Sequence, residues 1–558
     1  PSDIREDFKK DLGFGSFIFK MADGRVIGKA TNLRELEKML VDIPEASFLR
    51  HVRRNDFSRW LFARTEIDLA ARIRPLHGDD YADARTYCTH IAEIIRQRRI
   101  QRQKGLVIDF DPQNLDPDTE FLKLGSGSLG GKARGLAFMN TLLQQHADLH
   151  EKFENIKIGV PQTLVITTEE FEHFVELNEL QYLAKEELAD ERVAERFMAA
   201  EMPARLVDQL RAYLSNVNFP LAVRSSSLLE DAQYRAYAGL YNSYMLANDH
   251  DDLNCRLEQL VKAVKMVFGS TYFSGPKAYS RNVGHRTEEE QMAVIIQQLV
   301  GTCYNGHFYP ALSGVAQSYN YYPFAHMKPE DGVAAIALGM GKSVMGGESS
   351  LRFSPRYPNL LPDRSTVNDV LANAQRYFYS VKMQSAACLL GADDSATLAH
   401  REVCDASAEL PVRMLSSTYF PNEDRIRDAF SEAGSPVVTF HSILKYNAFP
   451  LAGILSDLLR IGEEAMGSPV EMEFCVNLGA APNFPGQFAI LQLRPMGARE
   501  ELLRIDIDRK EIDSAFIYSQ QALGNTMSND IRDIVFVKPA EFDTGKTRII
   551  AREIGKIN

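Results

Sequence analysis

The most informative stretch of this sequence is Leu124-Gly-Ser-Gly-Ser-Leu-Gly-Gly-Lys132-Ala-Arg-Gly-Leu136. Four glycines and two serines precede Lys132, and an apolar pattern of helical period starts at Leu136. We therefore expect a glycine-rich loop that leads into an amphipathic helix. Glycines let a backbone turn sharply and approach a ligand, and a helix N-terminus beside a lysine attracts anions. The stretch predicts a phosphate-binding loop.

The loop alone does not decide between a phosphate site and a flexible linker between domains. It lacks the spacing of a Walker loop, and it is not a Gly-x-Gly-x-x-Gly dinucleotide loop. The decision therefore depends on the rest of the chain.

The composition is that of a globular protein with several domains, because 558 residues exceed what one core holds. No apolar run approaches the ~20 residues of a membrane span, so we expect no membrane partner. The six cysteines lie far apart without a Cys-x-x-Cys pair, which predicts a reducing, cytoplasmic location and no structural zinc. The net charge of −12 argues against a general nucleic-acid binder.

Residues 1–115 are expected to form a separate α/β unit of unknown role, ending in the turn-rich segment Asp109–Asp118. Short strands are expected on both sides of Asp23-Gly24. Helical patterns follow, and they cover Leu33–Leu40, Trp60–Ile73 and Tyr81–Arg99.

This first unit is basic and the remainder is acidic. Through residue 110 it holds 21 Lys and Arg against 17 Asp and Glu, a net charge of +4, so the remaining chain carries −16. The basic run Arg96–Lys104 fits the solvated end of a helix. The segment Arg53–Trp60 mixes charged and aromatic residues, so it is either a binding face or a surface that packs against another domain.

Residues 116–500 are expected to form the main domain. The segment Pro220–Asp231 contains a short buried strand that ends in Arg224 and three serines. Ligand groups in α/β proteins lie at such strand ends, so the arginine suggests an anion site. A salt bridge from Arg224 to Glu230 or Asp231 is the alternative.

Eight short motifs resemble, in order, the nucleotide-binding domain of the pyruvate phosphate dikinase and phosphoenolpyruvate synthase family. They are Gly130-Gly-Lys132, Val160-Pro to Thr167-Thr168, Val223-Arg-Ser-Ser226 with Glu230-Asp231, Tyr237-Ala-Gly-Leu240, Met292–Val300, Ser313-Gly-Val-Ala316, Glu471-Met-Glu-Phe474 and Leu491-Gln-Leu-Arg-Pro495. Each motif is weak alone, but together they span about residues 124–496. The resemblance implies an α/β (α+β), ATP-grasp-like fold of several subdomains.

The resemblance also implies a site for ATP and Mg²⁺. Lys132, Arg224 and Arg494 are the expected catalytic residues, and Glu473 and Gln492 the expected metal ligands. The implied cofactor-binding residues are Gly130, Gly131, Lys132, Arg224, Gln297, Leu299, Glu473, Gln492 and Arg494. The residue chemistry agrees, because cations clamp phosphates, hard oxygens suit Mg²⁺, and Arg494 lies one strand period beyond Gln492. An ordinary exposed strand face, with Arg494 paired across it, is the alternative.

Four departures from the family pattern are visible. Gly339-Met-Gly-Lys342 replaces Gly-Leu-Gly-Glu, which exchanges a carboxylate for a cation, and Gln317-Ser318 replaces Phe-Thr. None of the 12 histidines stands in the family's phosphohistidine motif, and no segment matches the pyruvate-binding barrel. Residues 501–558 look like a C-terminal extension, and we expect the chain to be a fragment of a longer polypeptide.

The sequence thus predicts an ATP- and Mg²⁺-dependent phosphotransferase module. It transfers a phosphoryl group to an unidentified acceptor, either a small molecule or a protein histidine in trans. The alternative is a nucleotide-sensing regulatory module that binds ATP without turnover.

Overall fold

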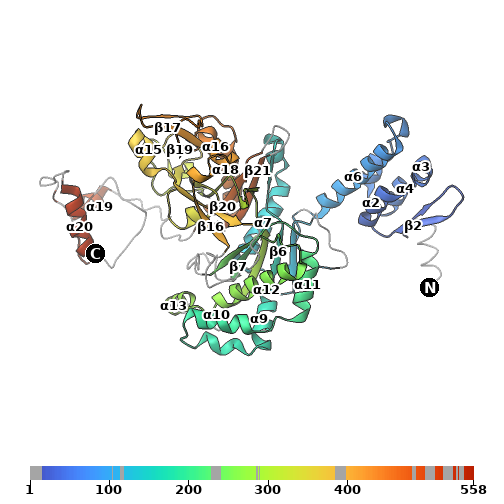
Figure 1. The fold of residues 1–558 in the computed structure, drawn as a ribbon, viewed down its shortest axis with the longest axis horizontal. Helices are drawn as coiled ribbons and strands as arrows, with labels where there is room; N and C mark the ends of the chain where they lie inside the picture. The colour runs from blue at the N-terminus through green and yellow to red at the C-terminus, as the bar shows by residue number, and fades with distance from the viewer. Residues whose placement is uncertain are drawn as a thin grey trace.

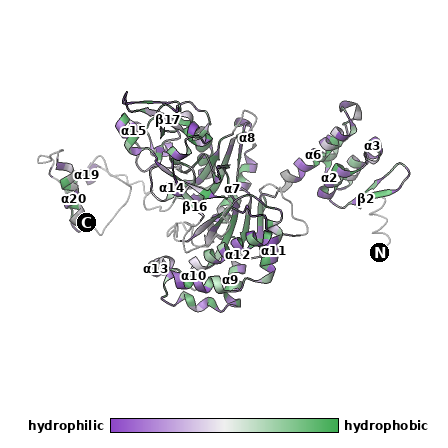
Figure 2. Cartoon of the chain, viewed as in Figure 1, coloured by the Kyte–Doolittle hydropathy of each residue, from purple (hydrophilic) through white to green (hydrophobic). Residues whose placement is uncertain are grey.

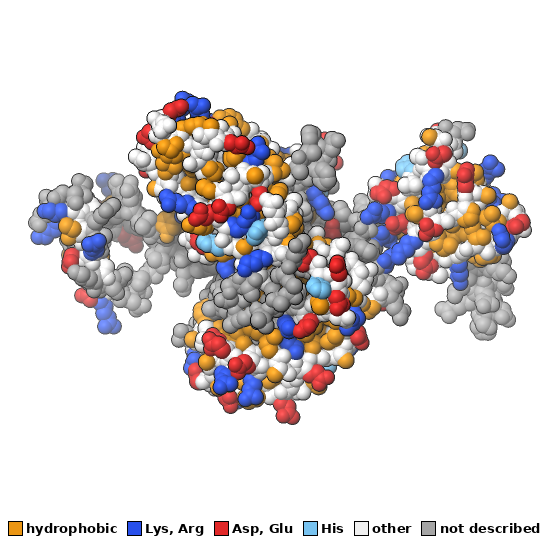
Figure 3. All heavy atoms as spheres, viewed as in Figure 1, with side chains coloured by type: hydrophobic (Ala, Val, Ile, Leu, Met, Phe, Trp, Pro, Cys, Tyr) orange, Lys and Arg blue, Asp and Glu red, His pale blue; other side chains and the backbone are white. Residues whose placement is uncertain are grey.

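The computed structural model describes most of the chain. The described residues are 15–103, 105–112, 119–227, 241–283, 287, 290–383, 397–479, 486–496, 509–518, 532–535, 538 and 546–557. Within them the chain forms five β-sheets with helices packed around them, which confirms a mixed α/β fold. Both signs of charge are interspersed over the visible face (Figure 3).

The N-terminal unit has its own apolar core and lies to the right of the main body in Figure 1. Its elements are β1 (Phe17–Lys20), β2 (Val26–Ala30), α2 (Leu33–Asp42), α3 (Glu45–Arg53), α4 (Asp56–Ala63), α5 (Ile67–Ile73), the 3₁₀ turn η1 (Gly78–Asp80) and α6 (Ala84–Gln103). The predicted hairpin around Gly24 is confirmed. The prediction of one helix over Trp60–Ile73 is wrong, because Thr65 takes a left-handed conformation (φ +63°) and separates α4 from α5.

The first large sheet has the strand order β3-β4-β6-β9-β7-β8. The strands are β3 (Ile108–Asp109), β4 (Phe121–Leu124), β6 (Thr163–Ile166), β7 (Leu221–Ser227), β8 (Ser243–Leu246) and β9 (Met292–Gln298). Helices lie below it in Figure 1, namely α9 (Thr168–Leu177), η2 (Leu180–Ala184), α10 (Asp190–Ala199), α11 (Ala204–Leu214), α12 (Leu253–Ser270) and α13 (Ser274–Val283). Hydrophobic residues follow the strands at the centre of the body (Figure 2).

The second large sheet has the strand order β14-β13-β12-β20-β21-β5. The strands are β5 (Ile156–Gly159), β12 (Leu312–Gln317), β13 (Val333–Leu338), β14 (Leu351–Phe353), β20 (Val470–Asn477) and β21 (Gly486–Pro495). Helix α18 (Leu451–Met466) packs against β20, and α7 (Gly130–Gln145), followed by α8 (Ala147–Lys152), packs against both β21 and β7. Helix α7 therefore contacts both large sheets.

Two smaller sheets and several short helices complete the body. The first sheet contains β10 (Thr302–Tyr304), β11 (His307–Tyr309), β15 (Tyr377–Lys382) and β16 (Leu398–Glu402), and the second β17 (Ser416–Phe420), β18 (Arg425–Arg427) and β19 (Ser435–Val438). The helices are η4 (Pro329–Asp331), α14 (Lys342–Met345), η5 (Pro362–Arg364), α15 (Val367–Asn373), η6 (Cys404–Ala406), α16 (Leu410–Leu415) and α17 (His441–Leu444); α19 (Arg509–Ser514) and α20 (Thr547–Ile557) follow near the C-terminus.

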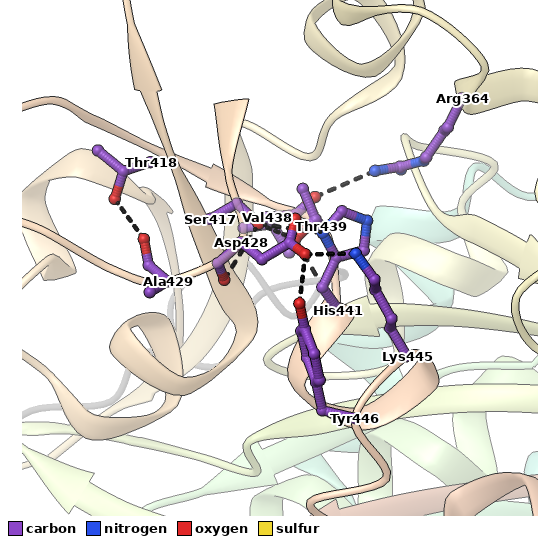
Figure 4. A network of polar contacts seen from close by, with 10 residues as sticks. All are labelled: Arg364, Ser417, Thr418, Asp428, Ala429, Val438, Thr439, His441, Lys445 and Tyr446. Carbon is purple, nitrogen blue, oxygen red and sulfur yellow. Dashed lines mark hydrogen bonds and ion pairs between the residues drawn. The ribbon is translucent and has the colours of Figure 1, made fainter. Parts of the chain in front are cut away.

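A polar network ties the three-stranded sheet to α17 (Figure 4). Asp428 accepts hydrogen bonds from Lys445 Nζ at 2.6 Å and from the Tyr446 hydroxyl at 2.7 Å. His441 Nδ1 lies 3.0 Å from Asp428 Oδ1 and 3.3 Å from Ser417 Oγ. Because serine and carboxylate meet the same ring nitrogen, these residues cannot act as a Ser-His-Asp triad, which needs one partner on each nitrogen.

Candidate functional site

A cavity of about 290 Å³ lies between the two large sheets and collects most of the predicted site residues. The predicted residues that line it are Lys132, Arg224, Gln297, Leu299, Glu473, Gln492 and Arg494. They come from α7, β7, β20, β21 and the end of β9, segments that are far apart in the sequence. The fold therefore brings these separate motifs to one place.

Arg224, on the buried strand β7, reaches across to the second sheet. Its Nη2 lies 2.8 Å from Glu473 Oε2 and 3.4 Å from Gln492 Oε1, and its Nη1 donates to the carbonyl of Leu491 at 3.1 Å. The guanidinium is mostly buried, so these contacts fix its position. Glu473 is thus a partner of Arg224, whereas Glu230 and Asp231 lie outside the described residues.

Strands β20 and β21 carry two cross-strand pairs of polar side chains on one face of the second large sheet. Glu473 lies opposite Gln492 and Glu471 lies opposite Arg494, as the two-residue period of a strand requires. Arg494 Nε donates to Glu471 Oε1 at 2.8 Å, so the cross-strand pair is present. Gln317 also donates to Glu471, at 2.7 Å.

An irregularity in the β20–β21 pairing creates a contact that was not predicted from the sequence. The register shifts after Glu473, so that Phe474 pairs with Ile490 and Leu491 is the extra residue. Such bulges re-aim side chains and free backbone groups. Here the Leu491 carbonyl accepts from Arg224, and Leu491 lines the cavity together with its neighbour Gln492.

The glycine loop packs tightly against its surroundings. Three of its backbone N–H groups are used within the protein: Ser126 donates to Glu169 at 2.7 Å, Ser128 to Thr168 at 3.1 Å, and Gly130 to the Ser128 hydroxyl at 3.2 Å. These three donors are therefore not directed at a ligand, which differs from the simplest form of a phosphate loop. Gly130 and Gly131 are buried and are not among the described residues that line the cavity.

The glycines instead bring α7 close to both sheets. Gly130 has φ +74°, and a Cβ there would lie 1.6 Å from the Ser226 carbonyl oxygen of β7. A Cβ at Gly135 would lie 2.5 Å from the Leu493 carbonyl oxygen of β21. This close packing places Lys132 at the cavity, where its Nζ lies 3.3 Å from Ser225 Oγ.

The other part of the cavity is apolar. Its wall is formed largely by Ala222, Met245, Val300, Pro310, Met340, Met345, Leu398 and Leu491. At the expected adenine edge, Gln297 donates to Thr163 at 3.2 Å and the Leu299 N–H donates to the Pro220 carbonyl at 2.9 Å. Both residues line the cavity, but these two donors bind protein groups.

Positive side chains outnumber negative ones at the cavity. Lys132, Arg224, Arg494 and Lys342 line it, with Glu473 as the acidic residue among the described lining groups. Burial alone would raise the pKa of Glu473, but Arg224, then Lys132 and Arg494, outweigh burial and hold that pKa below its ordinary value. Glu473 is therefore ionised at neutral pH. Lys342 belongs to the Gly339–Lys342 departure and was not among the predicted site residues.

The fold and this cation-lined cavity agree with the expected nucleotide-binding domain. Residues 126–510 match the family described as pyruvate phosphate dikinase, AMP/ATP-binding domain. The chain therefore belongs to this family, and its mixed α/β architecture agrees with the expected ATP-grasp-like fold.

Two curated bacterial proteins are distant relatives. One is an uncharacterized phosphotransferase, YvkC, of Bacillus subtilis, 26% identical over 215 residues, which are 38% of this chain and 22% of the relative. The other is a rifampicin phosphotransferase of Bacillus cereus, 25% identical over 173 residues, which are 28% of this chain and 18% of the relative. The matched regions span about a fifth of each relative.

Proposed function

We propose that this chain is an ATP-dependent phosphotransferase module. The observation that carries the proposal is one cavity in which four cations meet a carboxylate and an amide beside an apolar wall. In such a site the apolar wall would contact the nucleotide base, and the cations would bind the phosphates. The family match and the relatives' printed names support the same class.

The cations have distinct proposed roles. Phosphoryl transfer depends mostly on positioning and on stabilising charge, so the protein needs fixed donors more than a nucleophile. Lys132 and Arg224 would hold the phosphates, Arg224 with a fork already fixed by three acceptors. Arg494 would stabilise charge on the transferred group, because it reaches the cavity from the strand edge.

Glu473 and Gln492 fit a magnesium ion that is shared with phosphate. Their oxygens approach the same nitrogen of Arg224, at 2.8 and 3.4 Å, and the residues are cross-strand partners, so the two oxygens are neighbours. The described residues contain no cluster of three or more His, Cys, Asp or Glu that would hold a metal alone. A pair of protein oxygens, such as those of Glu473 and Gln492, suits Mg²⁺. This ion usually binds one or two protein oxygens and completes its shell with substrate phosphates and water. When bound, the ion would neutralise phosphate charge.

The acceptor is left open by this proposal. The matched relatives are phosphotransferases, and the name of one of them specifies rifampicin. We propose as the phosphoryl acceptor either a small molecule or a histidine of another protein chain. Among the described residues, no helix is both long and apolar enough to cross a membrane. We propose a cytoplasmic module, as the cysteine pattern suggests.

The deciding experiment follows the γ-phosphate. The chain is incubated with Mg²⁺ and γ-labelled ATP, alone and with candidate acceptors, and label is measured on protein, on small molecules and as free phosphate. ATP at about 100 times its dissociation constant should also stabilise the fold by roughly 2.7 kcal/mol. Unchanged unfolding in millimolar Mg·ATP would contradict the proposal.

A nucleotide sensor without turnover is the second candidate. Both carboxylates of the site are engaged by arginines, Glu473 by Arg224 and Glu471 by Arg494. If ATP binds without reacting, both ion pairs could stay intact. ATP binding with no label on any acceptor and no released phosphate would favour the sensor.

A further inference from the structure

A second hollow, in the N-terminal unit, is lined by four cations. It measures about 580 Å³ and lies between β1 and the helices α3 and α4. Its charged wall contains Lys20, Arg50, Arg54 and Arg59. Arg54 and Arg59 belong to the segment Arg53–Trp60, whose role the sequence left open. The hollow shares no described residue with the cavity between the large sheets.

These four cations have no carboxylate partner within the described residues. Arg50 donates to the backbone carbonyls of Met21 and Ala22, at 2.7 and 3.0 Å, and so is fixed without being neutralised. The arginines of α6 behave differently. Arg98 lies 3.7 Å from Glu66, and Arg99 lies 3.0 Å from Glu37. Arg98 and Arg99 of the basic run are therefore paired with carboxylates, and among the described residues the four cations of the hollow are not.

The acidic residue on the wall is already engaged. His51 Nε2 accepts the backbone N–H of Lys20 at 2.9 Å, so the ring proton must be on Nδ1 when the histidine is neutral. His51 Nδ1 then donates to Asp56 Oδ2 at 2.7 Å. The His51 side chain is buried and ties β1 to α3 and α4. These contacts fix the wall that His51 and Asp56 share, and cations outnumber carboxylates on the described lining of the hollow.

We propose that this hollow binds a multiply charged phosphate ester of about nucleotide size. Arginine forks match phosphate oxygens in pairs, and a compact polyanion neutralises several cations at once. Phe17 and Trp60 add an aromatic wall, with the Trp60 indole fixed by the Gly15 carbonyl at 2.8 Å. The volume lies in the range of about 300–1,000 Å³ that is typical of small-molecule sites. The site would give the N-terminal unit a ligand of its own, separate from the proposed ATP site.

Trp60 provides a direct test, because it is the one tryptophan of the chain and lies in this hollow. The full chain is titrated at low salt, with excitation selective for tryptophan, using inorganic pyrophosphate, ADP and citrate. The expected result is a saturable change with pyrophosphate and a larger affinity for ADP, while citrate, a polyanion without phosphate, binds more weakly. ATP bound between the large sheets has no tryptophan nearby, so failure of one proposal does not imply failure of the other.

Charge-reversal variants distinguish anion binding in the hollow from non-specific attraction of anions to the basic surface. Replacing both Arg54→Glu and Arg59→Glu should raise the dissociation constant at least about tenfold, since charge-assisted bonds are lost. Replacing both Arg25→Glu and Arg53→Glu makes the same change of net charge at exposed positions outside the hollow and should stay within about twofold. The proposal is overturned by no response at about 10 mM ligand, by an unchanged dissociation constant in the double variant, or by equal or stronger binding of citrate.

Discussion

Arg224 on β7 and Glu473 on β20 form an ion pair of 2.8 Å that joins the two large sheets. Neither residue is fully exposed, and the same guanidinium holds the Leu491 carbonyl of β21. Removing one partner from such a pair costs more than the pair contributes, because the other charge is left partly buried. The groups proposed to bind ATP thus also fix how the sheets meet. Variants at Arg224 would mix structural and catalytic effects, whereas Glu473→Gln keeps an oxygen that accepts from Arg224.

Arg494 offers a cleaner test of the proposed chemistry. Arg494→Ala should leave ATP affinity within several-fold and lower phosphoryl transfer or ATP hydrolysis by about 100-fold or more, because a guanidinium aimed at developing charge acts mainly in the transition state. Glu471→Gln is the control, since it removes the ion-pair partner and keeps Arg494. Steady-state kinetics and ATP titrations measure both effects. Equal losses in the two variants would mean that Arg494 only braces the sheet.

Gly130 tests whether close packing of α7 is what places Lys132. Gly130→Ala adds a Cβ that would lie 1.6 Å from the Ser226 carbonyl oxygen, at φ +74°. We expect a loss of at least about 3 kcal/mol in the free energy of unfolding, from backbone strain and the clash together. Gly453→Ala, in helix α18 with its Cβ in ordinary van der Waals contact 3.5 Å from Phe153, should instead stabilise by about 0.5–1 kcal/mol. Similar unfolding midpoints for the two variants would contradict the packing argument.

Much of the site could be predicted because it follows strand geometry. A cation on a buried strand and the two-residue spacing of Gln492 and Arg494 both have a direct structural meaning, and the structure places all three at one cavity. The expected strand end is wrong, because β7 continues through the serines to Ser227 and Arg224 lies at its middle. The β1–β2 hairpin was equally readable from its Asp-Gly turn.

The remaining features depend on tertiary contacts. The bulge at Leu491 carries no glycine or other local signal. Helix α3 was missed because its start at Glu45 and its buried face have meaning only against β1 and α6. Lys342 could have been suspected, since it stands where a family carboxylate was expected. Its position on the cavity wall depends on how α14 packs against β12 and β13.

Asp428 makes the stability of the three-stranded sheet depend on pH. Partial burial alone would raise its pKa, but hydrogen bonds from Lys445 and Tyr446 and the nearby charges lower the pKa from 3.8 to about 2. A depressed pKa stabilises the fold above the unfolded value and loses that effect as pH falls through the folded value. Asp428→Asn should therefore cost roughly 1 kcal/mol at pH 7, allowing for the partial exposure of this carboxylate, and the cost should shrink between about pH 5 and pH 2.

Denaturant unfolding of wild type and variant across this pH range measures the effect. Asp424→Asn is the matched control, because it makes the same change of charge at an exposed position nearby. Its effect should be small and should not follow the same pH course. A difference for Asp428→Asn that stays constant with pH would show that the side chain matters for packing and not for charge.

Glu473 tests the proposed metal site. Glu473→Gln keeps the volume and one acceptor oxygen but removes the charge that Mg²⁺ needs, so the Mg²⁺ concentration for half-maximal turnover should rise about tenfold or more. Turnover should then recover partly at high Mg²⁺, which a merely structural defect would not show. If wild type has no turnover, the same shift is sought in the Mg²⁺ dependence of ATP-induced stabilisation. Glu471→Gln, two residues away on the same strand face and paired with Arg494, should leave the Mg²⁺ dependence unchanged. Identical Mg²⁺ curves for wild type and Glu473→Gln would remove this carboxylate from the metal site and leave it as the partner that holds Arg224.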